Sequence, residues 1–105
     1  MPQFTVYRNQ NPESKTHVPY LLDVQSDLLA DLVTRVVVPL AWASDMKGHA
    51  IKSLMPTFEI EGEQCVMLTP QLAGVSGKWL GEPVANLLAH RADVIAALDL
   101  LITGI

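Results

Sequence analysis

Acidic, imidazole and thiol side chains are the groups in this 105-residue sequence that could carry chemistry. The three histidines, His17, His49 and His90, stand far apart, and they share no metal-binding spacing with Cys65 or with a carboxylate pair. Because Cys65 lies in an apolar alternation, we interpret it as a small buried residue rather than a reactive thiol. No nucleophile-elbow, phosphate-binding or dinucleotide motif is present. The sequence therefore predicts no catalytic residue, no metal and no cofactor.

Carboxylates recur at two regular spacings. Asp23, Asp27 and Asp31 are four residues apart and would share one face of a continuous helix, where they could attract a divalent cation. Because the residues around Asp23 are strand-like, we instead assign these aspartates to solvated surface or to the capping of loops. The glutamates that alternate between residues 59 and 63 are typical of the exposed face of a sheet.

The composition indicates one small domain with more apolar residues than its core needs. Half of the residues are hydrophobic and 17% are charged, whereas roughly a quarter are charged in an ordinary globular domain. A domain of this size buries only about 60 to 70% of the surface that its unfolded chain exposes, so its core is modest. We therefore expect a single domain over residues 1–105 with an apolar surface for self-association or for a partner.

Charge and hydropathy exclude several classes of partner. The net charge of −4 argues against direct binding of nucleic acid, because contacts to phosphates need clustered Lys and Arg side chains. The first residues, "MPQFTVYRNQ", lack the basic start and the apolar run of a secretory signal, and no stretch approaches the roughly 18 apolar residues of a membrane span. The single cysteine fits a reducing compartment. We expect a cytoplasmic protein that does not bind membranes.

Short strands account for most of the regular pattern. Apolar and β-branched runs predict strands at residues 3–8, 20–25 and 35–40 and a hairpin at residues 56–69. Gly62 supplies the positive φ that the tight turn of the hairpin needs. Pro39 is expected to end its strand, because proline cannot donate to a central ladder. A further short strand is expected around Trp79.

Three segments between these strands lack a clear period. Residues 9–19 are polar and carry two prolines, which favours an exposed connection that a partner could use. Residues 41–55 are expected to form a long loop with one helical turn. The segment "SDLLADLVT", residues 26–34, is expected to form a short helix or an irregular excursion that carries Leu28 and Leu29 outward.

The period of the sequence changes near its end. Residues that recur every three or four positions form one helical stripe: Val84, Leu87, Leu88, Arg91, Ile95, Leu98 and Ile102. This stripe predicts a helix that begins between Pro83 and Leu87. Many short strands followed by one terminal helix predict a mainly β (α+β) fold, a small barrel or sandwich with the helix packed on it.

The closing segment "LDLLITGI", residues 98–105, is apolar and carries no basic residue. Asp99 lies in the last turn of the predicted helix, where the backbone dipole is already negative, and this placement costs roughly 0.3 to 1 kcal/mol at an exposed site. Such an end is either buried in the core of its own chain or docked against a cationic, apolar groove of a partner. The residues alone leave both interpretations open.

A set of short segments runs through the sequence nearly from end to end. They are "QFTVY" at residues 3–7, "LDVQSDLL" at 22–29, "RVVVPL" at 35–40, "LMPTFEI" at 54–60, "VMLTPQLAGV" at 66–75, "LGEPVANL" at 80–87 and the closing Gly104-Ile105. In these segments the sequence resembles the CcdB toxins of bacterial toxin–antitoxin modules. The combination of "VQSD", the strand from Arg35 to Pro39 and the Gly-Ile end makes the resemblance specific.

The resemblance implies a homodimer of small SH3-like barrels, each with a C-terminal α-helix, that poisons DNA gyrase without being an enzyme. In that family the helices of both subunits meet near the dyad, present their last residues to the gyrase A subunit and trap the complex with cleaved DNA. Carried over residue by residue, the gyrase-binding face comprises Leu28, Leu29, Asp99, Ile102, Thr103, Gly104 and Ile105. No cofactor or metal is implied.

The resemblance also implies a CcdA-like antitoxin that is partly disordered and folds on the toxin. Exposed connections such as residues 9–19 and 41–52 suit such a partner. Toxin and antitoxin together are expected to repress the promoter of their own module. The antitoxin would contact the operator DNA, which agrees with the acidic charge of this chain.

Thr103 is a departure from the family pattern, because some members carry a tryptophan there. A tryptophan can stack on an arginine of the target, which contributes roughly 0.5 to 2 kcal/mol through cation–π attraction. Two alternative functions are therefore kept: an RNA-cleaving toxin on the same architecture, since fold alone does not fix function, and a non-toxic homologue that binds the antitoxin. RNA cleavage needs a basic groove and a proton-transfer pair, and the sequence shows neither.

Overall fold

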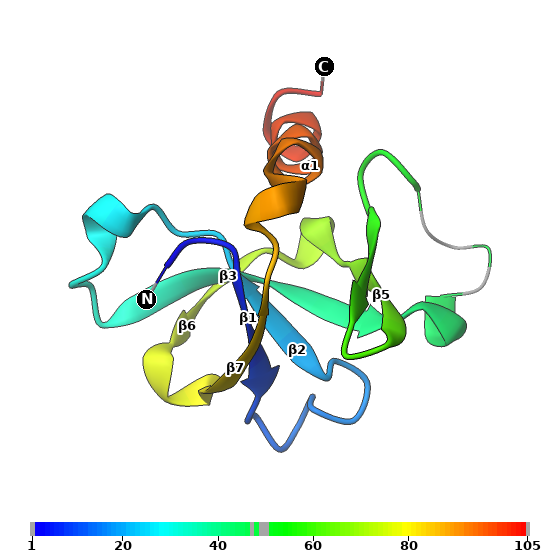
Figure 1. Ribbon diagram of the computed structural model, residues 1–105. Helices are drawn as coiled ribbons and strands as arrows, with labels where there is room; N and C mark the ends of the chain where they lie inside the picture. The colour runs from blue at the N-terminus through cyan, green and yellow to red at the C-terminus, as the bar shows by residue number, and fades with distance from the viewer. Residues whose placement is uncertain (1, 47, 49–50, 105) are drawn as a thin grey trace.

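The computed structural model describes residues 2–46, 48 and 51–104, and in these residues a strongly curled sheet is followed by one helix (Figure 1). The strands are β1 (Thr5–Asn9), β2 (Tyr20–Asp23), β3 (Thr34–Trp42), β4 (Thr57–Ile60), β5 (Glu63–Met67), β6 (Ala73–Ser76) and β7 (Leu80–Asn86), and the helix is α1 (Arg91–Thr103). Short 3₁₀ turns are η1 (Asp27–Leu29), η2 (Ala43–Met46), η3 (Thr69–Gln71), η4 (Gly77–Trp79) and η5 (Leu88–His90). The expected mainly β fold with a C-terminal helix is confirmed, with the sheet curled into a half-barrel.

The longest strand, β3, connects the two halves of the sheet. The strands follow the order β4-β5-β3-β2-β1-β7, and each neighbouring pair is antiparallel. Along one edge β3 pairs with β2, and along the other it pairs first with β6 and then with β5. In the described part of the chain, β4, β6 and β7 each pair with a single strand.

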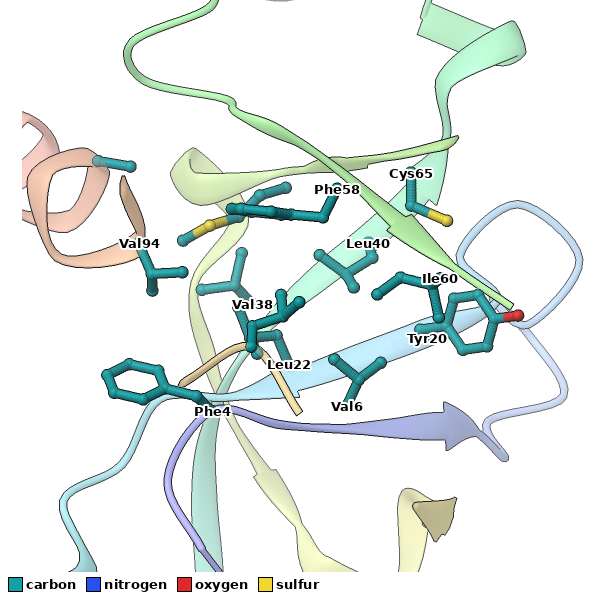
Figure 2. Close-up of a cluster of buried hydrophobic side chains, with 13 residues drawn as sticks. Phe4, Val6, Tyr20, Leu22, Val38, Leu40, Phe58, Ile60, Cys65 and Val94 are labelled. Atoms are coloured by element: carbon teal, nitrogen blue, oxygen red, sulfur yellow. The ribbon is translucent and has the colours of Figure 1, made fainter. Parts of the chain in front are cut away.

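Alternate side chains of the central strands meet in one core, onto which α1 packs (Figure 2). The fully buried members include Val6 of β1, Leu22 of β2, Val38 and Leu40 of β3, Ile60 of β4 and Met67 of β5, and α1 contributes Val94 and Ala97. Burial of each large apolar side chain contributes about 1.5 to 3 kcal/mol. The fully buried side chains of α1 lie in its first seven residues, and Leu98 packs against the core in a partly buried position, whereas Ile102 is exposed.

Strand β3 continues through Pro39 to Trp42, so the expectation that Pro39 ends the strand is wrong. Pro39 is paired with Leu21 of β2, and its carbonyl oxygen accepts a hydrogen bond from the Leu68 N–H at 2.9 Å. The N–H and C=O of a strand residue point to the same edge, so the missing N–H of Pro39 also faces the side of Leu68. On that side, Pro39 lies between the residues of β3 that pair with β6 and those that pair with β5, so neither ladder needs an N–H from it.

The helix begins at Arg91, so the expected start between Pro83 and Leu87 is also wrong. Residues 80–86 instead form β7, which is antiparallel to β1 with Pro83 opposite Tyr7. Proline is tolerated there because β7 is an edge strand. Pairing with β1 therefore overrides the helical spacing of the apolar residues in this segment.

Two strands stand where one was expected around Trp79. Trp79 itself belongs to the turn η4, which joins β6 to β7 and is capped by the Ser76 hydroxyl at 3.4 Å from the Lys78 N–H. A Cβ placed on Gly81 would lie 2.9 Å from the Arg8 carbonyl oxygen, which is closer than side chains tolerate. The glycine therefore allows β7 to approach β1 closely.

The hairpin of β4 and β5 confirms the prediction for residues 56–69, including the positive φ of Gly62. Glu61 and Gly62 form its turn with φ values of 51° and 83°, as a type I′ turn requires. The Glu61 carboxylate accepts hydrogen bonds from the Tyr20 hydroxyl at 2.7 Å and from Arg8 Nη2 at 2.8 Å. Arg8 Nε also donates to Glu82 of β7 at 2.6 Å, so these side chains link the hairpin to β1, β2 and β7.

We expect Glu61→Gln to destabilise the protein more at neutral pH than in acid. The Tyr20 hydroxyl and the Arg8 guanidinium hold the pKa of Glu61 below its ordinary value of 4.5. The stabilisation is therefore fully present above pH 4.5 and is lost as the pH falls through the lowered pKa. Urea unfolding at pH 7 and at about pH 3 measures the difference, with Glu59→Gln on the same hairpin as control. An equal loss at both pH values would contradict this account.

Candidate functional site

The first candidate surface is the apolar loop, which we define as residues 26–33 between β2 and β3. Its turn η1 is capped by the Ser26 hydroxyl, which accepts a hydrogen bond from the Leu28 N–H at 3.2 Å. Leu28 is 94% exposed and Leu29 is 50% exposed. The expectation that this segment carries both leucines outward is confirmed.

A buried ion pair lies beneath the apolar loop. The side chain of Asp23 is 0% exposed and that of Arg35 is 2% exposed. Arg35 donates to the same carboxylate oxygen of Asp23 from Nη2 at 2.6 Å and from Nε at 3.1 Å, and the other oxygen accepts from the Gln25 N–H at 3.0 Å. Of the two roles expected for Asp23, solvated surface is wrong and the capping of a loop is confirmed, because its carboxylate caps the turn that leads into the apolar loop.

The amide of Gln25 ties the two ends of the apolar loop together. Its Oε1 accepts from the Val36 N–H at 2.9 Å, and its Nε2 donates to the Leu29 carbonyl at 2.7 Å. On the outside of the loop, the Asp27 carboxylate accepts from the Gln3 N–H at 2.7 Å. These bonds hold the backbone of the loop in a conformation that leaves Leu28 and Leu29 exposed.

Three further apolar residues extend this surface and were not expected from the sequence. Leu32 is 54% exposed, Val33 is 85% exposed and Val36, in β3, is 37% exposed. Alternation along β3 places Arg35 on the same face as Val37, where its side chain is buried, and Val36 on the opposite face, where it stays exposed. A signal was present, because leucine and valine recur in a segment flanked by aspartates, where a solvated loop would have polar residues.

The second candidate surface is the helix end, which we define as residues 99–104. Ile102 is 72% exposed, and Asp99, Thr103 and Gly104 are exposed as well. The helix ends at Thr103 and is capped by Gly104, whose φ of 72° is left-handed and whose N–H donates to the Leu100 carbonyl at 3.0 Å. Burial in the core of its own chain is excluded for Ile102.

Thr103 and Asp99 occupy the last turn of α1 together. The Thr103 hydroxyl donates to the Asp99 carbonyl oxygen at 2.6 Å, a local bond within the helix. Among the described residues of this turn none is basic. The negative end of the helix dipole and the Asp99 carboxylate therefore both contribute negative potential at this end of the helix. Ile105, the seventh residue of the predicted face, lies outside the described residues.

The predicted face is divided between two places in a single chain. Figure 1 shows the apolar loop projecting to one side of the sheet and the C-terminal end of α1 projecting above it. Leu28 and Leu29 are therefore together, and Asp99, Ile102, Thr103 and Gly104 are together. One chain alone does not join the two groups into a continuous surface.

Other possible chemistry is limited in the described part of the chain. No group of three or more His, Cys, Asp or Glu side chains in residues 2–46, 48 and 51–104 could hold a metal ion, and His49 lies outside these residues. Cys65 is buried, and burial raises the pKa of its thiol to about 11, so the interpretation as a small buried residue is confirmed. Within the same residues, no helix has the length and hydropathy that crossing a membrane would take.

These features define a small half-barrel protein whose loop and helix end expose apolar side chains that its core does not use. The family model described as CcdB protein matches residues 3–104 of the 105-residue sequence. The chain belongs to the CcdB family, the gyrase-poisoning toxins of toxin–antitoxin modules, which are not themselves enzymes.

We expect Asp23→Ala to lower the free energy of unfolding by about 3 to 5 kcal/mol, because it leaves the Arg35 guanidinium buried and unpaired. The double variant Asp23→Leu with Arg35→Met should recover most of this loss, since apolar residues of similar volume replace the pair. Urea unfolding measures both, and Asp31→Ala, at an exposed aspartate of the apolar loop, is the control. A loss below about 1 kcal/mol for Asp23→Ala, the scale of an exposed pair, would contradict the role of the ion pair.

Proposed function

We propose that this chain is the toxin of a type II toxin–antitoxin module, and that it binds the A subunit of DNA gyrase and traps the complex of gyrase with cleaved DNA. The proposed gyrase-binding residues are Leu28, Leu29, Asp99, Ile102, Thr103, Gly104 and Ile105. Membership of the CcdB family supports the activity. The observation that supports this choice of face is the 72% exposure of Ile102, in a helix whose first half is anchored in the core.

Leu28 and Ile102 are the apolar anchors of the proposed face. Transfer of a fully exposed leucine or isoleucine side chain into an apolar pocket contributes about 1.5 to 3 kcal/mol. At 94% and 72% exposure, these two side chains have most of that contribution still to gain from a partner. A few such anchors commonly dominate the affinity of an interface.

Asp99 is the proposed electrostatic contact. Its carboxylate lies in the last turn of α1, beside the negative end of the helix dipole. A lysine or arginine of gyrase placed there would neutralise both at once. The same cation would find no competing basic side chain in that turn of the helix.

Thr103 and Gly104 shape the end of the face. Thr103 offers no aromatic ring to a partner arginine. We therefore expect the free energy of binding to gyrase to be less favourable by roughly 0.5 to 2 kcal/mol than with tryptophan at this position. A Cβ placed on Gly104 would meet nothing within 4 Å, so the space beside its backbone is open to a partner. Glycine at this position therefore serves both the helix end and a close approach of gyrase.

We also propose that the chain acts as a homodimer. The two halves of the gyrase-binding face are apart in one chain. A two-fold axis that sets the helix ends of two subunits beside each other would bring two copies of the helix-end residues into one surface. The exposed Leu32, Val33 and Val36 support this, since they form an apolar surface at the start of β3 that a second copy could cover. A stable interface of this kind buries about 800 Å² on each partner.

A CcdA-like antitoxin is the proposed second partner, and the two proteins together are proposed to repress their own promoter. The connection at residues 9–19 is mostly exposed and offers polar side chains to an extended segment, and we place part of the antitoxin there and on residues 41–52. With a net charge of −4, this chain would leave contact with operator DNA to the antitoxin.

The deciding experiment incubates the purified protein with gyrase and supercoiled plasmid, and in parallel with RNA. We expect linear DNA after detergent and protease treatment, only when both gyrase and the protein are present, and intact RNA. Cleavage of RNA without linear DNA would replace the proposal with the nuclease alternative. Neither activity, with antitoxin binding retained, would indicate a non-toxic homologue.

We expect Ile102→Ala to weaken binding to the gyrase A subunit at least tenfold, or about 1.4 kcal/mol, because an apolar anchor is lost. Stability should change by less than about 0.5 kcal/mol, since the side chain is 72% exposed. Biolayer interferometry and urea unfolding measure the two effects. Leu88→Ala, which truncates a 60% exposed leucine before the start of α1, should leave gyrase affinity unchanged. Equal effects of the two variants would place the contact elsewhere.

Val33→Lys tests the proposed dimer interface. A lysine in place of this 85% exposed valine should leave the fold intact but should place an unpaired charge in the interface and shift the protein to monomer. Ile51→Lys, at a 58% exposed residue in the connection between η2 and β4, should leave the dimer unchanged. Analytical ultracentrifugation distinguishes the outcomes, and a wild-type protein that is monomeric at tens of micromolar would reject the interface outright.

A further inference from the structure

A pocket of about 160 Å³ lies on the face of the sheet opposite the main core. Leu21 of β2 and Val37 and Pro39 of β3 form its floor, and each alternates with a core residue of its strand. The walls come from Val18 before β2, Val75 of β6 and Trp79 of η4. Apolar side chains from five separate segments therefore converge on a space that none of them fills.

The size of this pocket matches a single aromatic ring. An apolar cavity of about 150 Å³ in a protein interior stays dry and holds benzene, which sets the scale for a pocket of about 160 Å³. The indole of Trp79 offers an edge or a face to such a ring, and aromatic pairs gain from that geometry beyond the area they bury.

The polar rim of the pocket carries no ionisable side chain. It consists of Asn9, Asn11, Ser14 and Gln71. The Asn9 amide is already used, because its Nδ2 donates to Ser14 Oγ and to the Val18 carbonyl, both at 2.9 Å. Within the described residues the Gln71 side chain makes no hydrogen bond, so its amide is available to a ligand.

The walls are held in place before any ligand arrives. Asn9 is 6% exposed, and besides its two donated bonds its Oδ1 accepts from the Asn11 N–H at 2.9 Å. These bonds fix the connection between β1 and β2 against the sheet. A preformed wall means that a ligand does not have to order the loop, so a small molecule can bind despite its small contact area.

We propose that this pocket binds one neutral aromatic ring that carries a hydrogen-bonding group, such as an indole or a phenol. The ring would lie on the apolar floor beside Trp79, and its N–H or O–H would meet the Gln71 amide. Lys78 Nζ, 5.0 Å from the centre of the Trp79 ring, disfavours a cationic ligand at the same place. The proposal is independent of gyrase binding.

The ring could belong to a free small molecule or to a tyrosine or tryptophan of a peptide. Saturation-transfer NMR with indole and phenol tests the free ring, and the N-acetyl amides of tryptophan and tyrosine test the side chain. We expect Kd values at or below about 1 mM for the preferred form. Tighter binding of the free rings points to a small molecule, and equal or tighter binding of the blocked amino acids points to a peptide.

Variants locate the binding in the pocket. Ala73→Phe, at an exposed residue of β6 that lines the pocket, should fill it and weaken binding at least tenfold. Gly74→Ala is the matched control, because a Cβ on Gly74 meets nothing within 4 Å and points to the other face of the strand. Gln71→Leu should weaken binding of phenol but not of toluene, which keeps the test valid if Ala73→Phe fails to fold.

Three results would overturn the proposal. They are the absence of saturable binding of every ring at 5 mM, full retention of binding by a folded Ala73→Phe variant, and binding of benzylammonium as tight as that of benzyl alcohol. The last pair of ligands differs in charge rather than in size. These experiments measure ring binding and do not involve gyrase. Failure of the pocket proposal can therefore be distinguished from failure of the gyrase proposal.

Discussion

The buried pair of Asp23 and Arg35 is the interaction on which the exposed architecture depends. Removal of two charges from water is costly, and the cost is offset here because the pair forms two charge-assisted bonds and the second carboxylate oxygen accepts a backbone N–H. Apolar residues could stabilise β2 and β3 as well. Only a polar group can also bind the backbone that leaves the sheet, and in this way the pair fixes where the apolar loop departs.

The two halves of α1 have different roles: the first packs on the core and the second projects from it. Val94 and Ala97 attach its first turns to the core, whereas Asp99 and Ile102 extend past it. An isolated helix of 13 residues is marginal in water, so the anchored half must stabilise the projecting half. The left-handed Gly104 then ends the helix beyond the core, where its last turn is open to solvent.

Local chemistry predicted part of this structure, and pairing between distant segments decided the rest. The turn at Glu61 and Gly62 follows from its neighbours alone, and so does the outward path of Leu28. The start of α1 could not be predicted from neighbouring residues, because contact with β1 decides that residues 80–86 are a strand. The pairing of Asp23 with Arg35 was equally invisible, since it depends on the register that sets Asp23 opposite Val37 and leaves Arg35 as its diagonal neighbour on the same face.

The exposed apolar residues are the part that folding of one chain does not explain. A leucine that is 94% exposed contributes almost nothing to the core, and a polar residue at Leu28 would improve solubility at no cost in packing. The same holds for Ile102 and Val33. Yet the protein encloses an ion pair and several side-chain hydrogen bonds to keep the apolar loop outside the core. Contact with a partner surface would bury these side chains and gain the hydrophobic free energy that the isolated chain does not, and this is the physical argument for proposing them as binding residues.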